Sequence, residues 1–425
     1  MKIPLKKIAS IFGLVTHSSL DVDSFFFDSR NVTKGGIFFA LKGENFNGHD
    51  FLESVAQKGA YAAVVDKQYQ GAGFGLELFH VGDVLVALQE LASFMLKEKE
   101  IKVIAVTGSV GKTTTKEMIY ALIAMKYKVH TSKGSFNTKI TLPITILEAK
   151  GDEDYLLLEM GMTKKGQIKT LTSIAPPTIA VLTQVTYCHS ENFDSLEEIA
   201  EAKAEIFLPS TEFAVIHEKS AKFDAVYRNC FCKNVLYPSP IGVLSPYKET
   251  HFSENFCAAY QVAKYLGMSD DQIRLASLTL AGRAVAHRFQ KIVRDGILFV
   301  DDSYNANAVS TVAALQNLPL PEKDGRKILV FGEMKELGAV NVASHQIVAN
   351  AAVKGVDMVF CIGKGAKIIF DRFINEGKPG HYFYDYRTLK EAVYKEMKKG
   401  DVVLLKGANS HKLWKILETL PALQK

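Results

Sequence analysis

The feature of this sequence that most constrains its fold is an apolar run, a glycine-containing loop and a helical pattern in direct succession. The apolar run covers residues 101–107, the loop GSVGKT covers residues 108–113, and the helical pattern extends over residues 114–124. A strand, a loop and a helix in this order open a nucleotide-binding α/β domain. Small loop residues let backbone N–H groups approach phosphate oxygens, and the helix N-terminus adds positive potential. The segment therefore predicts a binding site for a nucleoside triphosphate, without indicating the reaction.

Two side chains of this loop have the chemistry that a bound triphosphate needs. The Lys112 ammonium group can reach the outer phosphates, and the Thr113 hydroxyl can ligate Mg²⁺. The general phosphate-loop pattern has glycine at position 106, where this chain has Val106. An ordinary turn before a helix is the alternative, but the flanking strand and helix favour the phosphate loop. The candidate ATP-binding residues of the loop are Gly108, Ser109, Val110, Gly111, Lys112, Thr113 and Thr114.

The length and the rhythm of the chain predict several α/β domains. A chain of 425 residues is too long for one ordinary core. We expect a small α/β N-terminal domain over residues 1–83 and a central P-loop nucleotide-binding α/β domain over residues 84–285. Residues 286–425 alternate strand and helix patterns more regularly, which predicts a C-terminal Rossmann-like domain with a second doubly wound sheet.

Apolar runs and helical periodicity locate the expected elements. The expected strands cover residues 24–27, 37–40, 101–107, 155–160, 178–183, 213–216, 297–301, 327–332, 357–362 and 401–406. The expected helices cover residues 84–97, 114–124, 342–353, 389–397 and 412–420, with a shorter one near residues 200–205.

Composition excludes several functional classes. The net charge of +5, from 51 basic and 46 acidic residues, predicts no dedicated nucleic-acid surface. The five cysteines are odd in number and irregularly spaced, and we interpret the Cys230 and Cys232 pair as ordinary residues. No run of about 18 apolar residues occurs and the N-terminus lacks signal-peptide features, so we expect a cytoplasmic protein without a membrane span.

Three further polar residues lie where they could meet the triphosphate. Glu159 ends a predicted strand, His189 follows another by a short loop, and Lys203 lies in a predicted helix. Ligands of open α/β sheets bind beyond the carboxyl ends of the strands, so Glu159 and His189 could share a second cation there. Spacing alone favours the ordinary alternative for each: a surface acid, a loop histidine and a solvated lysine.

Taken together, these segments resemble the Mur ligase superfamily over essentially the whole chain. The order and spacing are typical of that superfamily for TGSVGKT at 107–113, EMG at 159–161, His189 and AKAEI at 202–206. The resemblance is strongest to the branch that adds D-alanyl-D-alanine to UDP-N-acetylmuramoyl-tripeptide. The segments typical of this branch are DSR at 28–30, NGHDF at 47–51, DDSYNAN at 301–307, GEMKELG at 332–338 followed by His345, and KGA at 406–408.

The resemblance implies an ATP-dependent ligase that forms a peptide bond through an acyl phosphate. The first domain would bind the uridine nucleotide, the second ATP and Mg²⁺, and the third the adenosine side and the incoming amine. The expected partners are UDP-N-acetylmuramoyl-tripeptide and D-alanyl-D-alanine, and we expect a monomer. Because an acyl phosphate must be protected from water, closure of the third domain over the second is also expected.

The resemblance also implies roles for individual residues. Catalytic roles fall to Lys112, Lys203 and His189. The ligands of two Mg²⁺ ions would be Thr113, Glu159, His189 and Lys203. Lys203 would be carbamylated, because an ammonium group repels Mg²⁺ whereas a carbamate can ligate or orient it. Further ATP contacts would come from Asn255, Arg288, Asp302, Asn305 and Asn307. The other substrates would be bound by Ser29, Arg30, Gly48, His49 and Asn137.

The chain departs from the family pattern at several positions, and different functions stay open. Residues 134–141 read GSFNTKIT where the family has GNxNNxxG, residues 184–189 read QVTYCH where it has NxGxxH, Ala308 replaces a proline, and His287 precedes Arg288. One such function is that of another superfamily ligase, which adds a single amino acid or glutamate, although the segment DNPR of one such branch is absent. A non-catalytic P-loop nucleotide-binding protein also stays open, as does a degenerate paralogue, which the altered residues 135–141 would suit.

Overall fold

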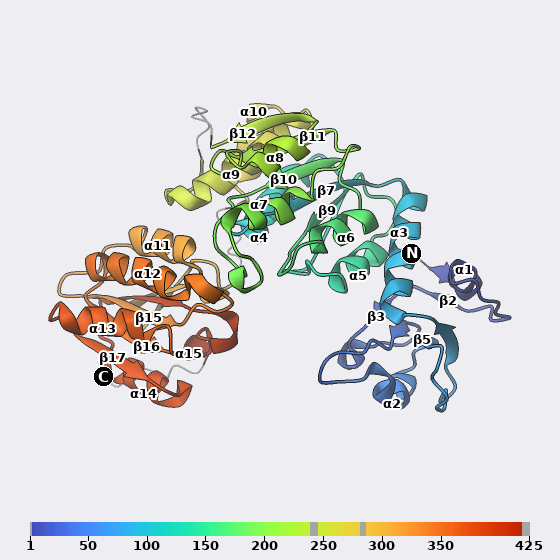
Figure 1. The fold of residues 1–425 in the computed structure, drawn as a ribbon, viewed down its shortest axis with the longest axis horizontal. Helices are drawn as coiled ribbons and strands as arrows, with labels where there is room; N and C mark the ends of the chain where they lie inside the picture. The colour runs from blue at the N-terminus through green and yellow to red at the C-terminus, as the bar shows by residue number, and fades with distance from the viewer. Residues whose placement is uncertain (1, 239–244, 281–285, 419–425) are drawn as a thin grey trace.

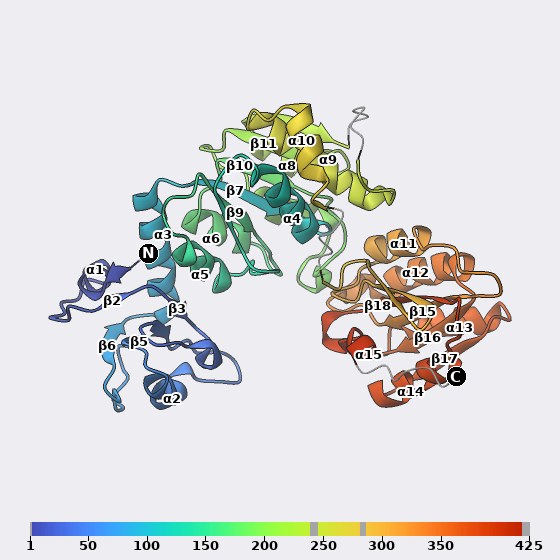
Figure 2. The same ribbon diagram turned by 180° about the vertical axis from the view of Figure 1, so that it is seen from behind.

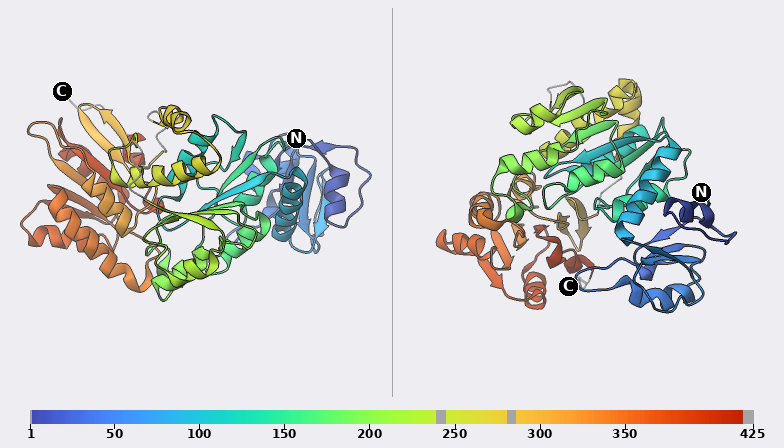
Figure 3. Two further views of the ribbon diagram at one scale, coloured as in Figure 1. Left: turned by 90° about the horizontal axis from the view of Figure 1, so that it is seen from above. Right: turned by 45° about the vertical axis from the view of Figure 1, so that its right-hand side comes forward.

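The computed structural model describes residues 2–238, 245–280 and 286–418. The strands in these ranges form one two-stranded, one four-stranded and two six-stranded sheets. Figure 1 shows three lobes, with the central one at the top and the N-terminal and C-terminal lobes below it on opposite sides. The view from behind gives the same arrangement, and the view from above shows the lobes in a row (Figures 2 and 3). The expected α/β fold of three domains is confirmed.

The N-terminal domain is built on a four-stranded parallel sheet in the order β3-β4-β5-β6. Its strands are β3 (Phe25–Phe26), β4 (Ile37–Phe39), β5 (Ala62–Asp66) and β6 (Glu77–Val81). The remaining elements are the antiparallel pair β1 (Ile3–Pro4) and β2 (Asp21–Val22), the helices α1 (Leu5–Ile11) and α2 (Leu52–Gln57), and the 3₁₀ turns η1 (Ser29–Asn31) and η2 (Gly48–Phe51).

Helix α3 (Val84–Lys99) joins the first domain to the second. The Asp83 carboxylate accepts hydrogen bonds from the backbone N–H groups of Leu85 and Val86, which fixes the start of the helix. Its apolar face, including Leu88 and Leu91, belongs to one continuous core with strands β4 and β5 and with central-domain helices. The boundary at residue 83 stays a prediction, and the boundary at residue 285 lies outside the described residues.

The central domain has a six-stranded, all-parallel sheet in the order β12-β11-β10-β7-β9-β8. Its strands are β7 (Lys102–Thr107), β8 (Val129–Thr131), β9 (Tyr155–Glu159), β10 (Ile179–Leu182), β11 (Phe213–His217) and β12 (Lys233–Tyr237). Its helices are α4 (Lys112–Ile123), α5 (Thr141–Glu148), α6 (Gln167–Ile174), α7 (Leu196–Ala204), α8 (Asp224–Asn229), α9 (Thr250–Tyr265) and α10 (Asp270–Ser277), with the 3₁₀ turn η3 (Ser190–Asn192).

Alternation along the strands explains why helices cover both faces of this sheet. In β7, Val103 and Ala105 pack into the core that contains α5, α6 and α7, whereas Ile104 and Val106 pack against α4, α9 and α10. Successive side chains of a strand point to opposite faces. A strand with apolar side chains at successive positions must therefore be covered by helices on both faces of the sheet. The strand ends at Thr107, where the phosphate loop begins.

The C-terminal domain repeats this architecture with one antiparallel edge. Its sheet has the order β13-β14-β18-β15-β16-β17, and only the pair β13 and β14 is antiparallel. Its strands are β13 (Gln290–Arg294), β14 (Ile297–Asp301), β15 (Lys327–Gly332), β16 (Met358–Ile362), β17 (Gly380–Phe383) and β18 (Val402–Lys406). Its helices are α11 (Ala308–Gln316), α12 (Asn341–Gly355), α13 (Lys367–Asn375), α14 (Tyr386–Glu396) and α15 (Lys415–Glu418), with the 3₁₀ turns η5 (Gly338–Val340) and η6 (Asn409–His411).

The expected strands are all present to within a residue or two, but the structure also has elements that were not expected, including strands β5, β6, β8, β12 and β13 and helix α9. One expected helix, near the C-terminus, differs. The helix expected over residues 412–420 does not begin at Lys412, whose φ of +48° is left-handed, and the described helix is limited to α15. Residues 419 and 420 lie outside the described residues. Among the helices that the structure describes, none combines the length and apolar character needed to cross a bilayer.

Candidate active site

The phosphate loop is held against the end of strand β10. Gly108 has a φ of +146°, and a Cβ at this position would lie 1.8 Å from the Thr183 hydroxyl oxygen. The Ser109 backbone N–H donates to the Gln184 carbonyl oxygen at 2.9 Å, and the Thr183 hydroxyl donates to the Val110 carbonyl oxygen at 2.6 Å. Glycine is therefore required at position 108, because a side chain would push the loop away from β10.

The Lys112 side chain folds back across the loop. Lys112 is the first residue of α4, and its Nζ atom donates to the Gly108 carbonyl oxygen at 2.9 Å. At the other end of the loop, Gly111 has a φ of +83°, and a Cβ there would lie 2.5 Å from the Asn255 Oδ1 atom on α9. The loop is thus fixed by the strand β10 on one side and by α9 on the other, with the lysine ammonium group over it.

Thr113 and Glu159 form the polar centre beside the loop. The Thr113 hydroxyl donates to the Glu159 Oε2 atom at 2.6 Å, and the Asn137 Nδ2 atom donates to Oε1 at 2.7 Å. Glu159 is buried at the end of β9. Arg288, from the start of the C-terminal domain, donates to the Thr113 hydroxyl oxygen at 2.8 Å and to the Ser135 hydroxyl oxygen at 3.2 Å. Four segments distant in sequence therefore meet at one hydroxyl group and one carboxylate.

This centre fits an Mg²⁺ ion whose coordination is completed by the phosphates of a bound nucleotide. A threonine hydroxyl and a carboxylate are the hard oxygen ligands that Mg²⁺ prefers, and Mg²⁺ takes its other ligands from water and substrate phosphates. The described residues contain no group of three or more histidine, cysteine or acidic side chains that could hold a metal ion unaided. The arrangement thus suits a metal that arrives with a nucleotide better than a permanently bound one.

Lys203 is buried directly behind the loop. Its Nζ atom donates to the Gly108 carbonyl oxygen at 2.9 Å, the same oxygen that Lys112 contacts. Burial and the nearby Lys112 charge lower the pKa of Lys203 to about 7. A substantial fraction of this amine is therefore uncharged at neutral pH, which is the form that reacts with CO₂.

His189 reaches across to the C-terminal domain. Its Nδ1 atom is hydrogen-bonded to the Glu336 carboxylate, and the Glu191 backbone N–H donates to the Glu336 carbonyl oxygen at 3.1 Å. Burial lowers the pKa of His189, but Cys188 and Glu336 outweigh burial and raise it. The pKa of Cys188 falls to about 7, because His189, Lys112 and Lys203 together outweigh the opposing effect of burial.

Two of the C-terminal residues expected near ATP, Asp302 and Asn305, contact the buried Lys406. Lys406 forms an ion pair with the Asp302 Oδ2 atom at 2.7 Å and donates to the Asn305 carbonyl oxygen at 2.8 Å. The Asn307 side chain accepts from the Ser310 backbone N–H at 2.8 Å and so caps helix α11. Lys406 was not among the expected site residues. It is the last residue of β18, and ligands of such sheets bind beyond the carboxyl ends of the strands.

One cavity of about 1270 Å³ connects these groups and lies between the central and C-terminal domains. Gly108 and Lys203 lie behind its wall rather than in its lining, and no described residue before Ser109 lines it. The expected site residues that do line it are Ser109, Val110, Gly111, Lys112, Thr113, Thr114, Asn137, Glu159, His189, Asn255, Arg288, Asp302, Asn305 and Asn307.

The four residues expected to bind the uridine nucleotide lie in the N-terminal domain. The exposed Arg30 guanidinium group forms a bidentate pair with Asp28, and it lies beside Ser29 in turn η1. His49 is buried, and its two ring nitrogens are bonded to the Asn47 side chain and to the Asp66 backbone N–H. A Cβ on Gly48 would lie 2.6 Å from the Ala40 carbonyl carbon. The His49 ring thus holds the turn together, and its substrate contact stays a prediction.

Lys116 is a positioning residue that the sequence analysis missed. It is fully buried on α4, and its Nζ atom donates to the carbonyl oxygens of Ser132 at 2.5 Å and Gly134 at 2.9 Å. These bonds fix the start of the segment that carries Ser135 and Asn137. A lysine one turn after the phosphate loop gives no sequence signal that separates it from a solvated one.

Replacing Lys116 with methionine should lower the free energy of unfolding by about 2–3 kcal/mol, because the buried Ser132 carbonyl oxygen and the partly buried Gly134 carbonyl oxygen lose a charged donor. Lys126→Met is the matched control, since exposed Lys126 also donates to a backbone carbonyl, that of Gly267 at 2.9 Å. The control should change stability by less than about 0.5 kcal/mol. Urea denaturation of both variants measures the difference, and equal midpoints would contradict a structural role for Lys116.

Family models match nearly the whole chain. The model described as Mur ligase family, catalytic domain, matches residues 23–108. The Mur ligase middle domain matches residues 106–260, and the model described as Mur ligase, glutamate ligase domain, matches residues 287–409.

Individual relatives each cover more than nine-tenths of the chain. The UDP-N-acetylmuramoyl-tripeptide–D-alanyl-D-alanine ligase of Bacillus subtilis is 32% identical over 431 residues, which cover 92% of each chain. The enzyme of the same name from Escherichia coli is 30% identical and covers 99% of this chain and 98% of its own. A solved structure of MurF ligase from Thermotoga maritima in complex with ADP has a TM-score of 0.78 at 30% identity, covering 94% of this chain and 97% of its own. A MurF structure from Acinetobacter baumannii, at 22% identity and a TM-score of 0.84, is similar in fold over 99% of both chains.

Proposed function

The chain belongs to the Mur ligase family, and we propose how its residues carry out the reaction of the branch that adds D-alanyl-D-alanine. The protein is an ATP-dependent ligase that joins D-alanyl-D-alanine to UDP-N-acetylmuramoyl-tripeptide in peptidoglycan synthesis. The observation that carries the mechanism is the meeting of the phosphate loop, the Thr113–Glu159 pair and Arg288 in one cavity.

The first chemical problem is the leaving group. A carboxylate resists attack by an amine because oxide leaves poorly, so the tripeptide carboxylate first attacks the γ-phosphate of ATP. The products are an acyl phosphate and ADP. The amine of D-alanyl-D-alanine then attacks the acyl carbon, inorganic phosphate leaves, and the amine loses a proton. Charge develops on phosphoryl oxygens in the first step and on the acyl oxygen in the second.

The phosphate loop and Lys112 stabilise the charge of the first step. The backbone N–H groups at the start of α4 face the cavity together with the Lys112 ammonium group. Lys112 rests on the Gly108 carbonyl oxygen, and a bound β- or γ-phosphate is a stronger acceptor for it. Arg288 contacts Thr113 from the other domain, which puts a second cation at the same place.

We assign the magnesium ligands to this centre. The sequence suggested that Glu159 shares a second cation with His189, but the Thr113–Glu159 hydrogen bond favours Glu159 beside the first. Thr113 and Glu159 would then hold one Mg²⁺, with Asn137 fixing the Glu159 carboxylate, and His189 with a carbamylated Lys203 would serve a second. The ions would supply charge stabilisation to the phosphoryl group. The low pKa of Lys203, about 7, supports carbamylation because the neutral amine is its reactive form. The hydrogen bond between His189 Nδ1 and Glu336 is compatible with this role, because a histidine ligand commonly donates one ring N–H to a carboxylate and binds the metal through its other ring nitrogen.

The remaining assignments follow from the division into domains. We propose that residues 1–83 bind the UDP moiety through Ser29, Arg30, Gly48 and His49, and that residues 286–425 present the dipeptide. A cavity bounded by both the central and the C-terminal domain supports closure of these two around the acyl phosphate. We further propose that the protein acts as a monomer. We also propose that it acts in the cytoplasm, the compartment that contains ATP and UDP-linked precursors.

Relatives that match nearly the full length of the chain do not support the rival functions. Relatives that bear the dipeptide-adding name cover more than nine-tenths of the chain at 30–32% identity. A non-catalytic nucleotide-binding protein would have no need for Glu159 and Arg288 to converge on Thr113, with Asn137 holding the Glu159 carboxylate. The altered segment 134–141 keeps Asn137 in that convergence.

The deciding experiment measures phosphate release from Mg-ATP with UDP-N-acetylmuramoyl-tripeptide and D-alanyl-D-alanine, omitting each acceptor in turn. We expect release only when both are present, together with a product heavier by one dipeptide. Replacing the dipeptide with single amino acids is the control for the other ligase branches. Release that needs neither acceptor, or no release in any combination, would refute the substrate assignment.

A further inference from the structure

Arg288 lies on a stretch of backbone with an uncommon conformation. His287 before it has a φ of +60°, and Phe289 after it has a φ of +54°. Few residues other than glycine adopt this left-handed region, and each costs free energy unless its surroundings hold it there. The Arg288 side chain leaves this stretch toward the central domain, where it bonds to Thr113. The contacts that hold His287 and Phe289 therefore determine the direction in which Arg288 points.

His287 is held by three contacts within the C-terminal domain. Its Nδ1 atom lies 2.7 Å from the Oδ2 atom of Asp301, the last residue of β14. An ionised carboxylate only accepts hydrogen bonds, so Nδ1 carries a proton and donates it. The His287 ring stacks on the indole of Trp414, with centroids 4.8 Å apart and planes at 26°. The His287 carbonyl oxygen accepts from the Tyr304 backbone N–H at 3.0 Å, so both the ring and the backbone of His287 are fixed.

The bond to Asp301 is the strongest of these contacts, because that carboxylate is buried. Its side chain is 2% exposed. The Oδ1 atom accepts from the backbone N–H and the hydroxyl of Ser303, whereas within the described part of the chain the Oδ2 atom is bonded by His287 alone. A buried carboxylate is stable only when its oxygens are hydrogen-bonded, so the Asp301–His287 bond is expensive to break.

Arg288 and Phe289 are anchored to the same loop that follows β14. The Phe289 backbone N–H donates to the Asp302 Oδ1 atom at 3.1 Å, and the Phe289 ring is buried in the C-terminal core. The Arg288 guanidinium group lies over the Tyr304 ring, 4.2 Å from its centroid. Residues 301–304 thus hold the backbone on both sides of Arg288 as well as its side chain. The arginine is an arm of the C-terminal domain, and only its charged end reaches the central domain.

We propose that His287, held by Asp301 and Trp414, is a positioning residue that directs Arg288 to the phosphates of the nucleotide. The inference rests on the proposed function, in which Arg288 is a cation beside the phosphoryl group. Arg288 lines the cavity and His287 does not, so His287 acts through the arginine rather than on a substrate. Displacing a catalytic group by about 1 Å can cost about 10²-fold in rate, so a contact that only sets the direction of Arg288 has a measurable effect.

A double-mutant cycle tests whether His287 acts through Arg288. The quantity measured is kcat/KM for Mg-ATP, from phosphate release with both acceptors saturating. It is compared for the wild type, His287→Ala, Arg288→Ala and the double variant. His287→Ala should lower kcat/KM about tenfold or more, and it should have no further effect beyond about twofold once Arg288 is alanine. A purely structural role for His287 would instead give the same fold loss in both backgrounds.

A conservative variant and a matched control complete the test. The side-chain N–H of His287→Asn can replace Nδ1–H toward Asp301, and asparagine tolerates the left-handed conformation that strains alanine. This variant should keep kcat/KM within about threefold of wild type. His381→Ala is the control, because exposed His381 also stacks on an aromatic ring of the C-terminal domain, that of Phe360 at 5.1 Å between centroids. It should keep kcat/KM within about twofold.

Trp414 supplies a second variant and a check on folding. It is the only tryptophan of the chain, so its fluorescence reports on the stacked ring in every variant. Trp414→Leu removes the stacking partner and leaves the His287 bond to Asp301 in place. It replaces His287→Ala in the cycle if that variant does not fold. Its loss of kcat/KM, about threefold or more, should likewise vanish once Arg288 is alanine.

The outcomes distinguish this inference from the proposed function. Wild-type kcat/KM in His287→Ala, or an undiminished loss in the Arg288→Ala background, would overturn the positioning role and leave the ligase reaction intact. The same holds if His287→Asn is as slow as His287→Ala, or if His381→Ala loses as much as either. A wild-type protein that releases no phosphate with both acceptors present would overturn the proposed function and this inference with it.

Discussion

Lys112→Ala should lower kcat by about 10²–10³-fold, the effect of removing one preorganised charge from a phosphoryl-transfer site. The Nζ atom lies over the loop at 2.9 Å from the Gly108 carbonyl oxygen, where the outer phosphates of ATP are expected. The neutral side chain leaves the charge that develops on the γ-phosphoryl oxygens without its nearest cation. Phosphate release at saturating substrates, compared with wild type, measures the loss.

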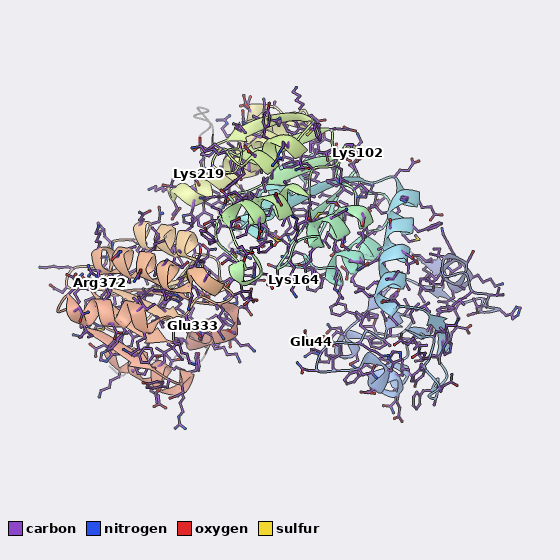
Figure 4. The ribbon with its side chains drawn as sticks, in the orientation of Figure 1. Glu44, Lys102, Lys164, Lys219, Glu333 and Arg372 are labelled. Carbon is purple, nitrogen blue, oxygen red and sulfur yellow. The ribbon has the colours of Figure 1, made fainter. Side chains whose placement is uncertain are left out.

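Lys102→Ala is the matched control for this prediction. Lys102 is exposed at the first residue of β7, on the same strand that leads into the loop (Figure 4). The control should keep kcat within about twofold, since surface changes away from such features have small effects. A Lys112→Ala enzyme with near wild-type kcat would contradict the phosphate assignment. Unchanged thermal melting of both variants shows that any loss is not a loss of folding.

The sequence locates the interior strands that were expected because most of their positions are apolar. Residues 101–107 and 297–301 are such runs, interrupted only by Lys102 and by the end residues Thr107 and Asp301, and the structure has β7 and β14 there. The pattern says much less about edge strands. Strand β13 was missed because only one of its sides is covered, so its sequence QKIVR mixes charged and apolar residues without a clear period.

The candidate site was predictable only in part, for a physical reason. The phosphate loop has a local signature, because its chemistry requires small residues and a lysine in consecutive positions. Glu159 and Arg288 are single residues, 129 positions apart in sequence, that both contact Thr113. The Glu159 contact forms only when the central sheet has folded, and the Arg288 contact only when the C-terminal domain has packed against the central one. Lys116 is a buried lysine, and nothing in its sequence neighbourhood separates it from a solvated one.

The same limit applies to side chains that meet only through the pairing of two strands. His217, Tyr237 and Glu254 are far apart in the chain, and the parallel register of β11 and β12 is what brings the first two together. A sequence pattern gives the existence of these strands but not the pairing of their last residues. Family resemblance adds little here, because it transfers known roles to matching positions and is silent about unpartnered groups.

Lys203→Ala should also lower kcat by about 10²–10³-fold, with partial recovery when short carboxylates such as formate or acetate are added. The expected reason is that a carbamate on this buried amine supplies a negative charge near the metal. Removing the side chain leaves a space that a small carboxylate can occupy. Phosphate release in rising concentrations of acetate, at constant ionic strength, measures the recovery.

The structure makes this experiment sharper, because Lys203 has a second possible role. Its Nζ atom donates to the Gly108 carbonyl oxygen, so the lysine could act only as a cationic support for the loop. In that case methylamine, rather than acetate, should restore activity to Lys203→Ala, and Lys203→Arg should remain active. Recovery by acetate alone, together with a carbamate signal in ¹³C NMR of wild-type protein equilibrated with labelled CO₂, would establish the carbamate. The signal should fade as the pH drops below about 7, where the amine becomes protonated and cannot react with CO₂.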